Sequence, residues 1–400
     1  MPQLYHGERL ATIASFPTLY RYLPAKKQQQ EDDEKPLVIF IPGMALLGRV
    51  AYGGHSGYDE RDFLVYWLNE LGYNVLAISY PLEMQGGQSD DDDDDDNGLR
   101  GKMAQCPHLT PRDWGEQTVL TALKVMEQQG LADNTRVTIA AWSMAGKILK
   151  PVVTSSQRHG LNVTLFLSLA ATPAGIKGLN FSPPRVRETR GGFTAGSETG
   201  IQSFIRQIQS QCVRQEGRNV VDERTLRREY LGNTPVSLTN AGVVYRDGST
   251  TTSGTRFRPV TATDLETTEP NGYDDMVHYP YIAAIRPTSP ADLRHALTDS
   301  AAWGLILTTK LTVDVTRAIG GNARRWPAGD EDEVWHAVQK LVLSAPTRLT
   351  SEVVHGNHMF FLGERGARAT AQSMDRLIRE AGTLGREMEA VLGRLQSSAV

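Results

Sequence analysis

The stretch 136–147, RVTIAAWSMAGK, places a single serine, Ser143, between an apolar β-branched run and a segment with a helical pattern. The run before Ser143 is typical of a strand that is buried on both faces of a parallel sheet. A strand that turns sharply into a helix at a serine is the geometry of a nucleophile elbow, in which small residues flank the turn. Ala141 and Ala145 stand where glycine fits best, and each adds only a methyl group. The stretch therefore predicts a nucleophilic serine, with an ordinary helix-start serine as the alternative.

Strand and helix patterns alternate on both sides of this stretch. Apolar runs over 36–43, 74–81 and 162–175 are typical of buried strands, and helical patterns cover 61–72 and 110–130. In the last of these, a threonine at the cap position, a proline in the first turn and a glycine at the end mark the bounds. Regular alternation of strand and helix predicts a mostly parallel sheet with helices on both faces.

The alternation stops between about 176 and 289, where Arg, Thr, Ser and Gly are frequent. A stretch of this length is more typical of an inserted domain than of a structureless loop. The alternation then returns in four predicted elements: a strand over 303–315, a helix over 330–344, a strand over 347–354 and a helix to about 396. We therefore predict a core over 1–175 and 290–400, and a cap or lid domain over 176–289.

Composition excludes several classes of protein. With 400 residues, 40% of them hydrophobic, the chain can bury a full core. It contains no apolar run long enough for a membrane span and no signal-peptide pattern at its N-terminus. Cys106 and Cys212 lie in unrelated contexts, which indicates reduced thiols and a cytoplasmic location.

The net charge of −4 depends on the run of seven aspartates Asp90–Asp96, without which basic residues outnumber acidic ones. We interpret the run as a solvated loop, because it lacks the alternating ligand spacing of a calcium site. Basic residues are not interleaved with aromatic ones, so no nucleic-acid partner is expected. No phosphate-binding loop and no zinc spacing are present, so the sequence predicts no cofactor and no metal. The expected partner is a small-molecule substrate, and a homodimer remains open.

The order of these parts resembles the α/β-hydrolase fold. The resemblance implies that the segment IPGM over 41–44 supplies the backbone N–H of Met44 to an oxyanion hole, and that Met144 supplies the second N–H. It also implies a histidine after the last strand, which His358 in HGNHMFF (355–361) fits better than His355. Ser143 and His358 then occur in the family's chain order of serine, acid and histidine.

The triad acid is less well marked. The resemblance implies a Gly–x–x–Asp turn after the strand before the last, but Thr312 stands where the aspartate is expected. Asp314 is the carboxylate nearest to that turn, and we predict it as the acid that fixes the histidine tautomer. Asp330, in the GDEDE segment over 329–333, is the alternative, although acids at a helix start also stabilise the helix dipole.

These parts predict a serine hydrolase that forms an acyl-enzyme with an ester, thioester or related carbonyl. The long insertion implies a pocket for a bulky, largely apolar acyl part. Two blocks, over 41–81 and 141–147, also resemble fungal secondary-metabolite hydrolases of the AK-toxin type, which implies a polyketide- or peptide-derived substrate. The alternatives are an acyltransferase or a condensing or cyclising enzyme on the same fold, and a binding protein without catalysis.

Overall fold

The computed structural model describes residues 4–26, 35–84, 103, 106–174, 187–188, 192–195, 198–239, 243–245, 257–269, 272–320 and 331–398. The predicted acidic loop over Asp90–Asp96 lies outside these residues. Cys106 and Cys212 are both buried free thiols.

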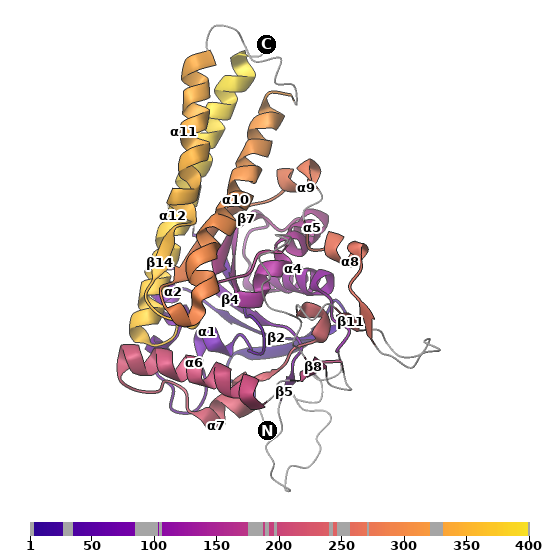
Figure 1. Ribbon diagram of the computed structural model, residues 1–400, viewed down its shortest axis with the longest axis vertical. Coiled ribbons are helices and arrows are strands. Elements are labelled where there is room, and N and C mark those ends of the chain that lie inside the picture. Colours follow the sequence, from indigo (N-terminus) through magenta and orange to yellow (C-terminus); the bar gives the residue numbers. More distant parts are fainter. Residues whose placement is uncertain are drawn as a thin grey trace.

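An eight-stranded sheet forms the centre of the described chain (Figure 1). Its strands, in spatial order, are β1 (Glu8–Ile13), β2 (Phe16–Leu23), β4 (Val75–Ser79), β3 (Leu37–Ile41), β6 (Val137–Trp142), β7 (Val163–Leu169), β13 (Tyr281–Pro287) and β14 (Glu352–Val354). Strand β2 pairs antiparallel with β1 and β4, and the remaining pairs are parallel. Every residue of β3, β4 and β6 is buried, because both faces of the sheet are covered.

The helices of the core form two layers. They are α1 (Arg49–Tyr52), α2 (Leu64–Glu70), α4 (Pro111–Gln129), α5 (Leu149–His159), α10 (Leu293–Ala318), α11 (Glu331–Leu349) and α12 (Glu364–Ser398). The connection from β3 to β4 runs in one direction along the sheet and that from β4 to β6 in the other. Crossovers between parallel strands are right-handed as a rule, so these two connections put α2 and α4 on opposite faces. Helix α5 packs on α4, and α12 packs on α2.

This arrangement confirms the predicted α/β-hydrolase fold with a mostly parallel central sheet. The predicted bounds of α4 are also confirmed, because Thr110 and Asp113 form a capping box and Gly130 ends the helix in the left-handed conformation. Helices α10, α11 and α12 extend side by side beyond the sheet (Figure 1).

The strand predicted over 303–315 is wrong, because these residues lie inside α10. Its apolar residues favour a strand by type, but their burial has the period of a helix. Trp303, Leu307 and Leu311 are fully buried, whereas Leu305 is 60% exposed. The strand that stands in this place in the sheet is β13, which the prediction had assigned to the insertion over 176–289. The insertion therefore ends before Tyr281, and the strand predicted over 347–354 shortens to β14.

The inserted segment between β7 and β13 is made of short elements. In chain order, they are β8 (Arg187–Glu188), β9 (Thr194–Ala195), α6 (Glu198–Glu216), α7 (Glu223–Thr225), η3 (Leu226–Tyr230), β10 (Gly232–Asn233), η4 (Val236–Leu238), β11 (Val243–Tyr245), β12 (Phe257–Pro259), α8 (Ala262–Glu266) and α9 (Tyr273–Val277). Strand β10 pairs with β5 (Glu83–Met84), and Leu231 bridges to Leu46 in the loop after β3. The insertion is thus joined to the loops at the carboxyl edge of the sheet.

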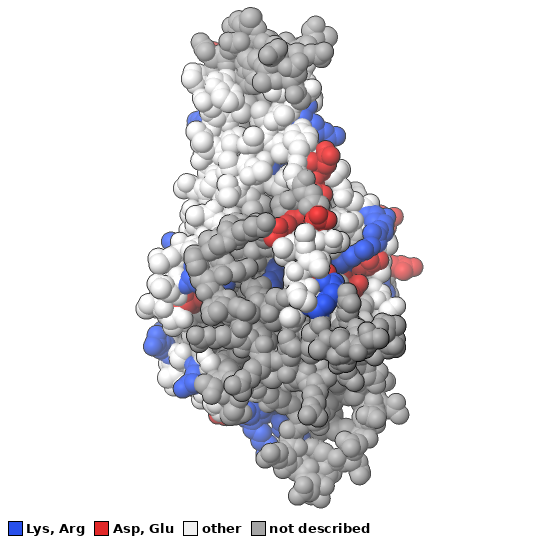
Figure 2. Space-filling model, turned by 45° about the vertical axis from the view of Figure 1, so that its right-hand side comes forward, with Lys and Arg blue, Asp and Glu red and all other residues white. Residues whose placement is uncertain are grey.

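Charged side chains of both signs lie next to one another on the face in Figure 2, where the described residues form no extended patch of one sign. The upper part of that face, which belongs to the helical extension, carries few charges. Within the described ranges, no helix is both long and apolar enough to cross a bilayer.

A buried ion pair joins the first strand to the core and to the insertion. The guanidinium of Arg49 donates to both carboxylate oxygens of Glu8 at 2.8 and 2.7 Å, and both side chains are fully buried. Arg49 also donates to the carbonyl of Glu229 at 2.9 Å, and the Tyr52 hydroxyl donates to Glu8 at 2.6 Å. Removing one partner of such a pair leaves an uncompensated buried charge.

We expect Glu8→Gln to lower the free energy of unfolding by about 3–5 kcal/mol, because Arg49 would keep its charge without a counter-ion. Urea denaturation measures the change. Glu60→Gln is the matched control, because the pair of Glu60 with Lys26 is exposed to 57% and 38% and should contribute less than about 1 kcal/mol. Equal losses in the two variants would contradict a special role for the buried pair.

Candidate active site

Ser143 follows the last residue of β6 and begins η2 (Ser143–Ile148), which leads into α5. Its φ angle is +56°, a left-handed conformation that a serine adopts only when the surrounding structure holds it there. The N–H of Thr172, in the loop after β7, donates to the Ser143 carbonyl at 2.9 Å. This is the strained strand-to-helix turn predicted from the sequence, and it presents the side chain at the carboxyl edge of the sheet.

Two glycines, Gly43 and Gly146, allow the backbone to pack tightly around this turn. A Cβ at Gly43 would lie 2.5 Å from the Cβ of Ser143, and a Cβ at Gly146 would lie 2.3 Å from the carbonyl oxygen of Thr172. Ala141 and Ala145 are fully buried, so their methyl groups fit the core. The tightest approaches therefore fall at Gly43 and Gly146, outside the small–x–Ser–x–small pentapeptide.

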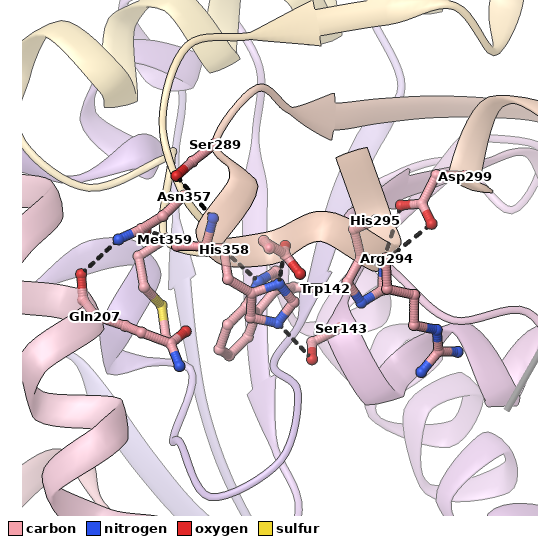
Figure 3. Close-up of polar contacts among 12 residues, drawn as sticks. Trp142, Ser143, Gln207, Ser289, Arg294, His295, Asp299, Asn357, His358 and Met359 are labelled. Carbon is pink, nitrogen blue, oxygen red and sulfur yellow. Dashed lines mark hydrogen bonds and ion pairs between the residues drawn. The ribbon is translucent and has the colours of Figure 1, made fainter. Parts of the chain in front are cut away.

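A chain of hydrogen bonds joins Ser143 to a histidine and an aspartate. The Oγ of Ser143 lies 2.8 Å from Nε2 of His358, and Nδ1 of His358 lies 2.8 Å from a carboxylate oxygen of Asp292. Figure 3 shows the imidazole of His358 directed at Ser143. With Nδ1 donating to the carboxylate, Nε2 is the unprotonated nitrogen and can accept the serine proton.

The loop that carries His358 is fixed from two sides. On one side, the indole N–H of Trp142 donates to the carbonyl of His358 at 3.0 Å, and the two rings lie 5.1 Å apart. On the other side, a side-chain N–H of Asn357 donates to the carbonyl of Gln207 on α6 (Figure 3). The Asn357 side chain also donates to the hydroxyl of Ser210 on the same helix. Because α6 belongs to the insertion, the inserted segment helps to set the position of His358.

Asp292 ends η5 (Pro290–Asp292), directly before α10, in the loop that follows β13. Burial raises the pKa of Asp292, but the hydrogen bond and charge of His358, with the charges of His295 and Arg294, lower it more in sum. The net pKa lies below the ordinary value. The carboxyl is therefore held ionised, as a group that stabilises an imidazolium must be.

Asp314, the acid predicted from the sequence, does not reach this site. It lies near the far end of α10, about 30 Å along the helix axis from Asp292 at about 1.5 Å per residue. Its carboxylate accepts from the ammonium of Lys310 at 2.6 Å. The prediction of Asp314 is thus corrected to Asp292, whereas the alternative Asp330 lies outside the described residues. His355, the second-choice histidine, binds Thr288 at 3.1 Å and is exposed.

Asp292 was missed because β13 was missed. The run YIAAIRP over 281–287 has the composition of a buried strand, and Asp292 is the first acidic residue after it. Had this run been placed in the sheet, the loop after it would have been the expected position of the acid. The irregular segment before this run interrupts the strand–helix alternation, so the alternation alone does not identify the run as a strand.

Two backbone N–H groups are available to bind a negative oxygen beside Ser143. A Cβ at Gly43 would lie only 3.1 Å from Ser143 Oγ, so the loop that contains Met44 passes next to the serine. Hydrogen bonds hold this loop, from Ala45 N–H to Thr234 at 2.9 Å and from the Tyr80 hydroxyl to the Gly43 carbonyl at 2.7 Å. Among the described residues, the N–H of Met44 donates to no backbone acceptor, and the N–H of Met144 lies in the first turn of η2, where backbone N–H groups have no acceptor within the helix. The two predicted donors therefore belong to segments that border the serine, and their role in an oxyanion hole stays a prediction.

Lys147, four residues after Ser143, connects the turn at Ser143 to the insertion. The ammonium of Lys147 donates to the carbonyl of Leu238, in η4, at 3.0 Å. Burial, and to a lesser degree the charge of Arg294, lowers the pKa of Lys147 to about 7. The insertion therefore contacts the loop of Met44 through Thr234, the helix of Ser143 through Lys147, and the loop of His358 through α6.

A second histidine, His295, lies beside the first. Asp292, His295 and His358 each bring a possible ligand atom within 4.8 Å of the others. Both ring nitrogens of His358 are already hydrogen-bonded, Nε2 to Ser143 and Nδ1 to Asp292, so neither is free to bind a metal ion. A metal ion there would have to break the Ser143–His358–Asp292 chain, which does not fit a resident metal.

Comparison with known proteins finds remote likenesses in structure only. No family model and no curated protein matches the chain. A serine hydrolase from the bacterium Cycloclasticus zankles has 10% identity and a TM-score of 0.41, over 95% of this chain and 98% of that one. A thermophilic esterase from Thermogutta terrifontis has 10% identity and a TM-score of 0.39, over 94% and 98%. The thioesterase domain of the curacin biosynthetic pathway has 11% identity and a TM-score of 0.39, over 94% and 100%. At this level of similarity, they do not identify a reaction.

We expect Gly146→Ala to lower stability by about 1–3 kcal/mol, because its methyl group would collide with the Thr172 backbone that supports the elbow. Thermal unfolding measures the change. Gly393→Ala is the matched control: Gly393 lies in α12 with open space around its Cα, so alanine there should stabilise by up to about 1 kcal/mol. A Gly146→Ala protein as stable as wild type would show that the elbow tolerates the extra bulk.

Asp292→Asn and Asp314→Asn form a pair that identifies the acid. An asparagine at 292 cannot hold the His358 tautomer, so the turnover rate of a chromogenic ester should fall by about 10³–10⁴-fold. The same change at 314 should leave the rate close to that of wild type, because Asp314 contacts Lys310 and not His358. The reverse ranking of the two variants would refute Asp292 as the acid.

Proposed function

We propose that the protein is a serine hydrolase that cleaves an ester, thioester or related carbonyl through an acyl-enzyme. The observation that carries the proposal is the hydrogen-bonded chain from Ser143 through His358 to Asp292, built on a strained turn at Ser143. A serine, an acceptor nitrogen and a buried carboxylate in this order form an activated nucleophile.

In this mechanism, Nε2 of His358 takes the proton of Ser143 as Oγ bonds to the carbonyl carbon. The N–H groups of Met44 and Met144 bind the oxygen that becomes negative, each worth about 3 kcal/mol in a site that excludes water. Asp292 remains ionised and stabilises the imidazolium. The bond from the carbonyl carbon to the leaving alcohol or thiol then breaks, which leaves the acyl-enzyme. A water molecule loses a proton as it bonds to the acyl carbon, and the acid is released as the acyl–serine bond breaks and Ser143 regains its proton.

The substrate is inferred to have a bulky, largely apolar acyl part. An apolar cavity of about 400 Å³ lies between α5, α9 and α10, with Pro173, Met276 and Trp303 among its lining residues. Pro173 directly follows Thr172, which binds the backbone of Ser143, so this cavity is our candidate acyl pocket. A role in secondary metabolism rests on the sequence resemblance to the fungal hydrolases of the AK-toxin type, and the comparisons with known proteins add no support to it.

A fluorophosphonate probe tests the proposal without knowledge of the natural substrate, because it reacts with activated serines. We expect intact mass spectrometry to find a single adduct on the wild type and none on Ser143→Ala. His358→Ala should label far more slowly, since it lacks the base. Ser203→Ala, which changes an exposed serine on α6, is the control and should label like wild type. A folded wild type that stays unlabelled would contradict an activated Ser143.

A further inference from the structure

Beside the Ser143–His358–Asp292 chain lies a second histidine–aspartate pair that the mechanism above does not use. Nδ1 of His295 lies 3.0 Å from each carboxylate oxygen of Asp299, one turn further along α10. Both side chains are buried, Asp299 to 2% exposure. The symmetric contact assigns the Nδ1 proton to a bond with the carboxylate, as in the pair of His358 and Asp292.

The ring of His295 stacks on that of His358, with 5.0 Å between centroids and 30° between planes. Figure 3 shows His295 between His358 and Asp299 in the view. Nδ1 is the nitrogen of His295 that binds Asp299, and Nε2 makes no hydrogen bond within the described residues. The residue as a whole is 7% exposed. The second imidazole thus places a nitrogen without a hydrogen bond to the described residues on the ring that lies against His358, the partner of Ser143.

A fold gains little from such a pair, because taking a carboxylate out of water is costly. Burial raises the pKa of Asp299, and the hydrogen bond and charge of His295 oppose this rise. An apolar pair of similar size in the first turns of α10 would avoid the cost. A buried carboxyl group with a perturbed pKa, beside the histidine that binds Ser143, is a candidate for a functional role.

Resting on the proposed hydrolase function, we propose that proton transfer is divided between the two stacked imidazoles. His358 serves Ser143, and His295, oriented by Asp299, serves the leaving group and then the attacking water.

In acylation, His358 Nε2 takes the proton of Ser143 as Oγ bonds to the carbonyl carbon. Protonated His295 gives its Nε2 proton to the leaving-group oxygen as the bond between that oxygen and the carbonyl carbon breaks. In deacylation, water gives a proton to the now neutral His295 as its oxygen bonds to the carbonyl carbon. His358 returns its proton to Ser143 as the acyl–serine bond breaks. Ester and water become acid and alcohol, and both imidazoles regain their starting forms.

This division keeps the charge of the site constant. In the free enzyme and in the acyl-enzyme, one of the two stacked rings is protonated, and each ring has its own carboxylate, Asp292 or Asp299. In acylation His295 loses a proton and His358 gains one, and in deacylation His358 loses a proton and His295 gains one. A buried site with a fixed total charge needs little solvent reorganisation during the reaction.

The leaving group provides the test. A p-nitrophenyl ester loses a stable phenolate and needs no acid, whereas the ethyl ester of the same acyl group needs one to release ethanol. His295→Phe keeps a ring against His358 and removes the nitrogen, His295→Ala removes both, and Asp299→Asn weakens the orientation of the ring. His278→Phe, at an exposed position after α9, is the matched control.

We expect His295→Phe to slow acylation by the ethyl ester about 10²-fold or more while affecting acylation by the p-nitrophenyl ester much less. With the p-nitrophenyl ester, its deacylation should slow, so stopped-flow traces should show a burst followed by a slower steady state. Asp299→Asn should also slow both acylation by the ethyl ester and deacylation after the p-nitrophenyl ester. His278→Phe should behave like wild type.

Two outcomes would overturn this inference while the proposed function stands. If His295→Phe labels with fluorophosphonate and slows both esters equally, or slows neither, then His295 has no separate proton-transfer role. If only His295→Ala is impaired, the ring supports His358 by stacking alone. A wild type that forms no adduct and no burst would instead overturn the proposed hydrolase function itself.

Discussion

The strained turn at Ser143 is the constraint on which the rest of the site depends. A serine at a φ of +56° costs about 1–3 kcal/mol and persists only if its neighbours leave it no alternative. Those neighbours are the Thr172 N–H that binds the Ser143 carbonyl, and two glycines, Gly43 and Gly146, that let backbone segments approach within contact distance. The same close packing brings the loop of Met44 next to the serine. The strain and the candidate oxyanion donors therefore have a common structural cause.

The remaining parts meet at this turn because parallel strands end at one edge of a sheet. Ser143 follows β6, Asp292 follows β13 and His358 follows β14, and the backbone N–H groups of Thr288 and Ser289 bind the carbonyl of Gly356 to join the last two loops. The insertion contributes more than a cover, because α6 holds Asn357 beside His358. Sequence-distant segments thus fix a geometry that no single loop could hold.

The sequence predicted an element correctly where neighbouring residues alone determine the structure. The β-branched run before Ser143, the capping residues of α4 and the histidine after β14 all occupy the predicted elements. It failed at α10, where β-branched residues over 303–315 lie in a helix whose buried face recurs at Trp303, Leu307 and Leu311. The residue types of 303–315 favour a strand, whereas their burial has the period of a helix, so a strand assignment there points to Asp314 as the acid and not to Asp292. His295 and Asp299 are four residues apart, a spacing that brings two side chains together only on a helix. The sequence therefore predicts their contact only once these residues are assigned to α10.

The central claim is that Ser143 becomes covalently acylated during turnover. Rapid quenching of the enzyme with a slowly deacylated p-nitrophenyl ester, followed by tryptic digestion, would test it directly. Cleavage after Arg136 and Lys147 releases the peptide 137–147, which contains Ser143 as its single serine. Our account predicts that this peptide gains the mass of one acyl group, which fragmentation places on Ser143 and which disappears on further incubation. Turnover of the ester with the peptide unmodified at every quench time, or with the acyl group on another residue, would contradict the account.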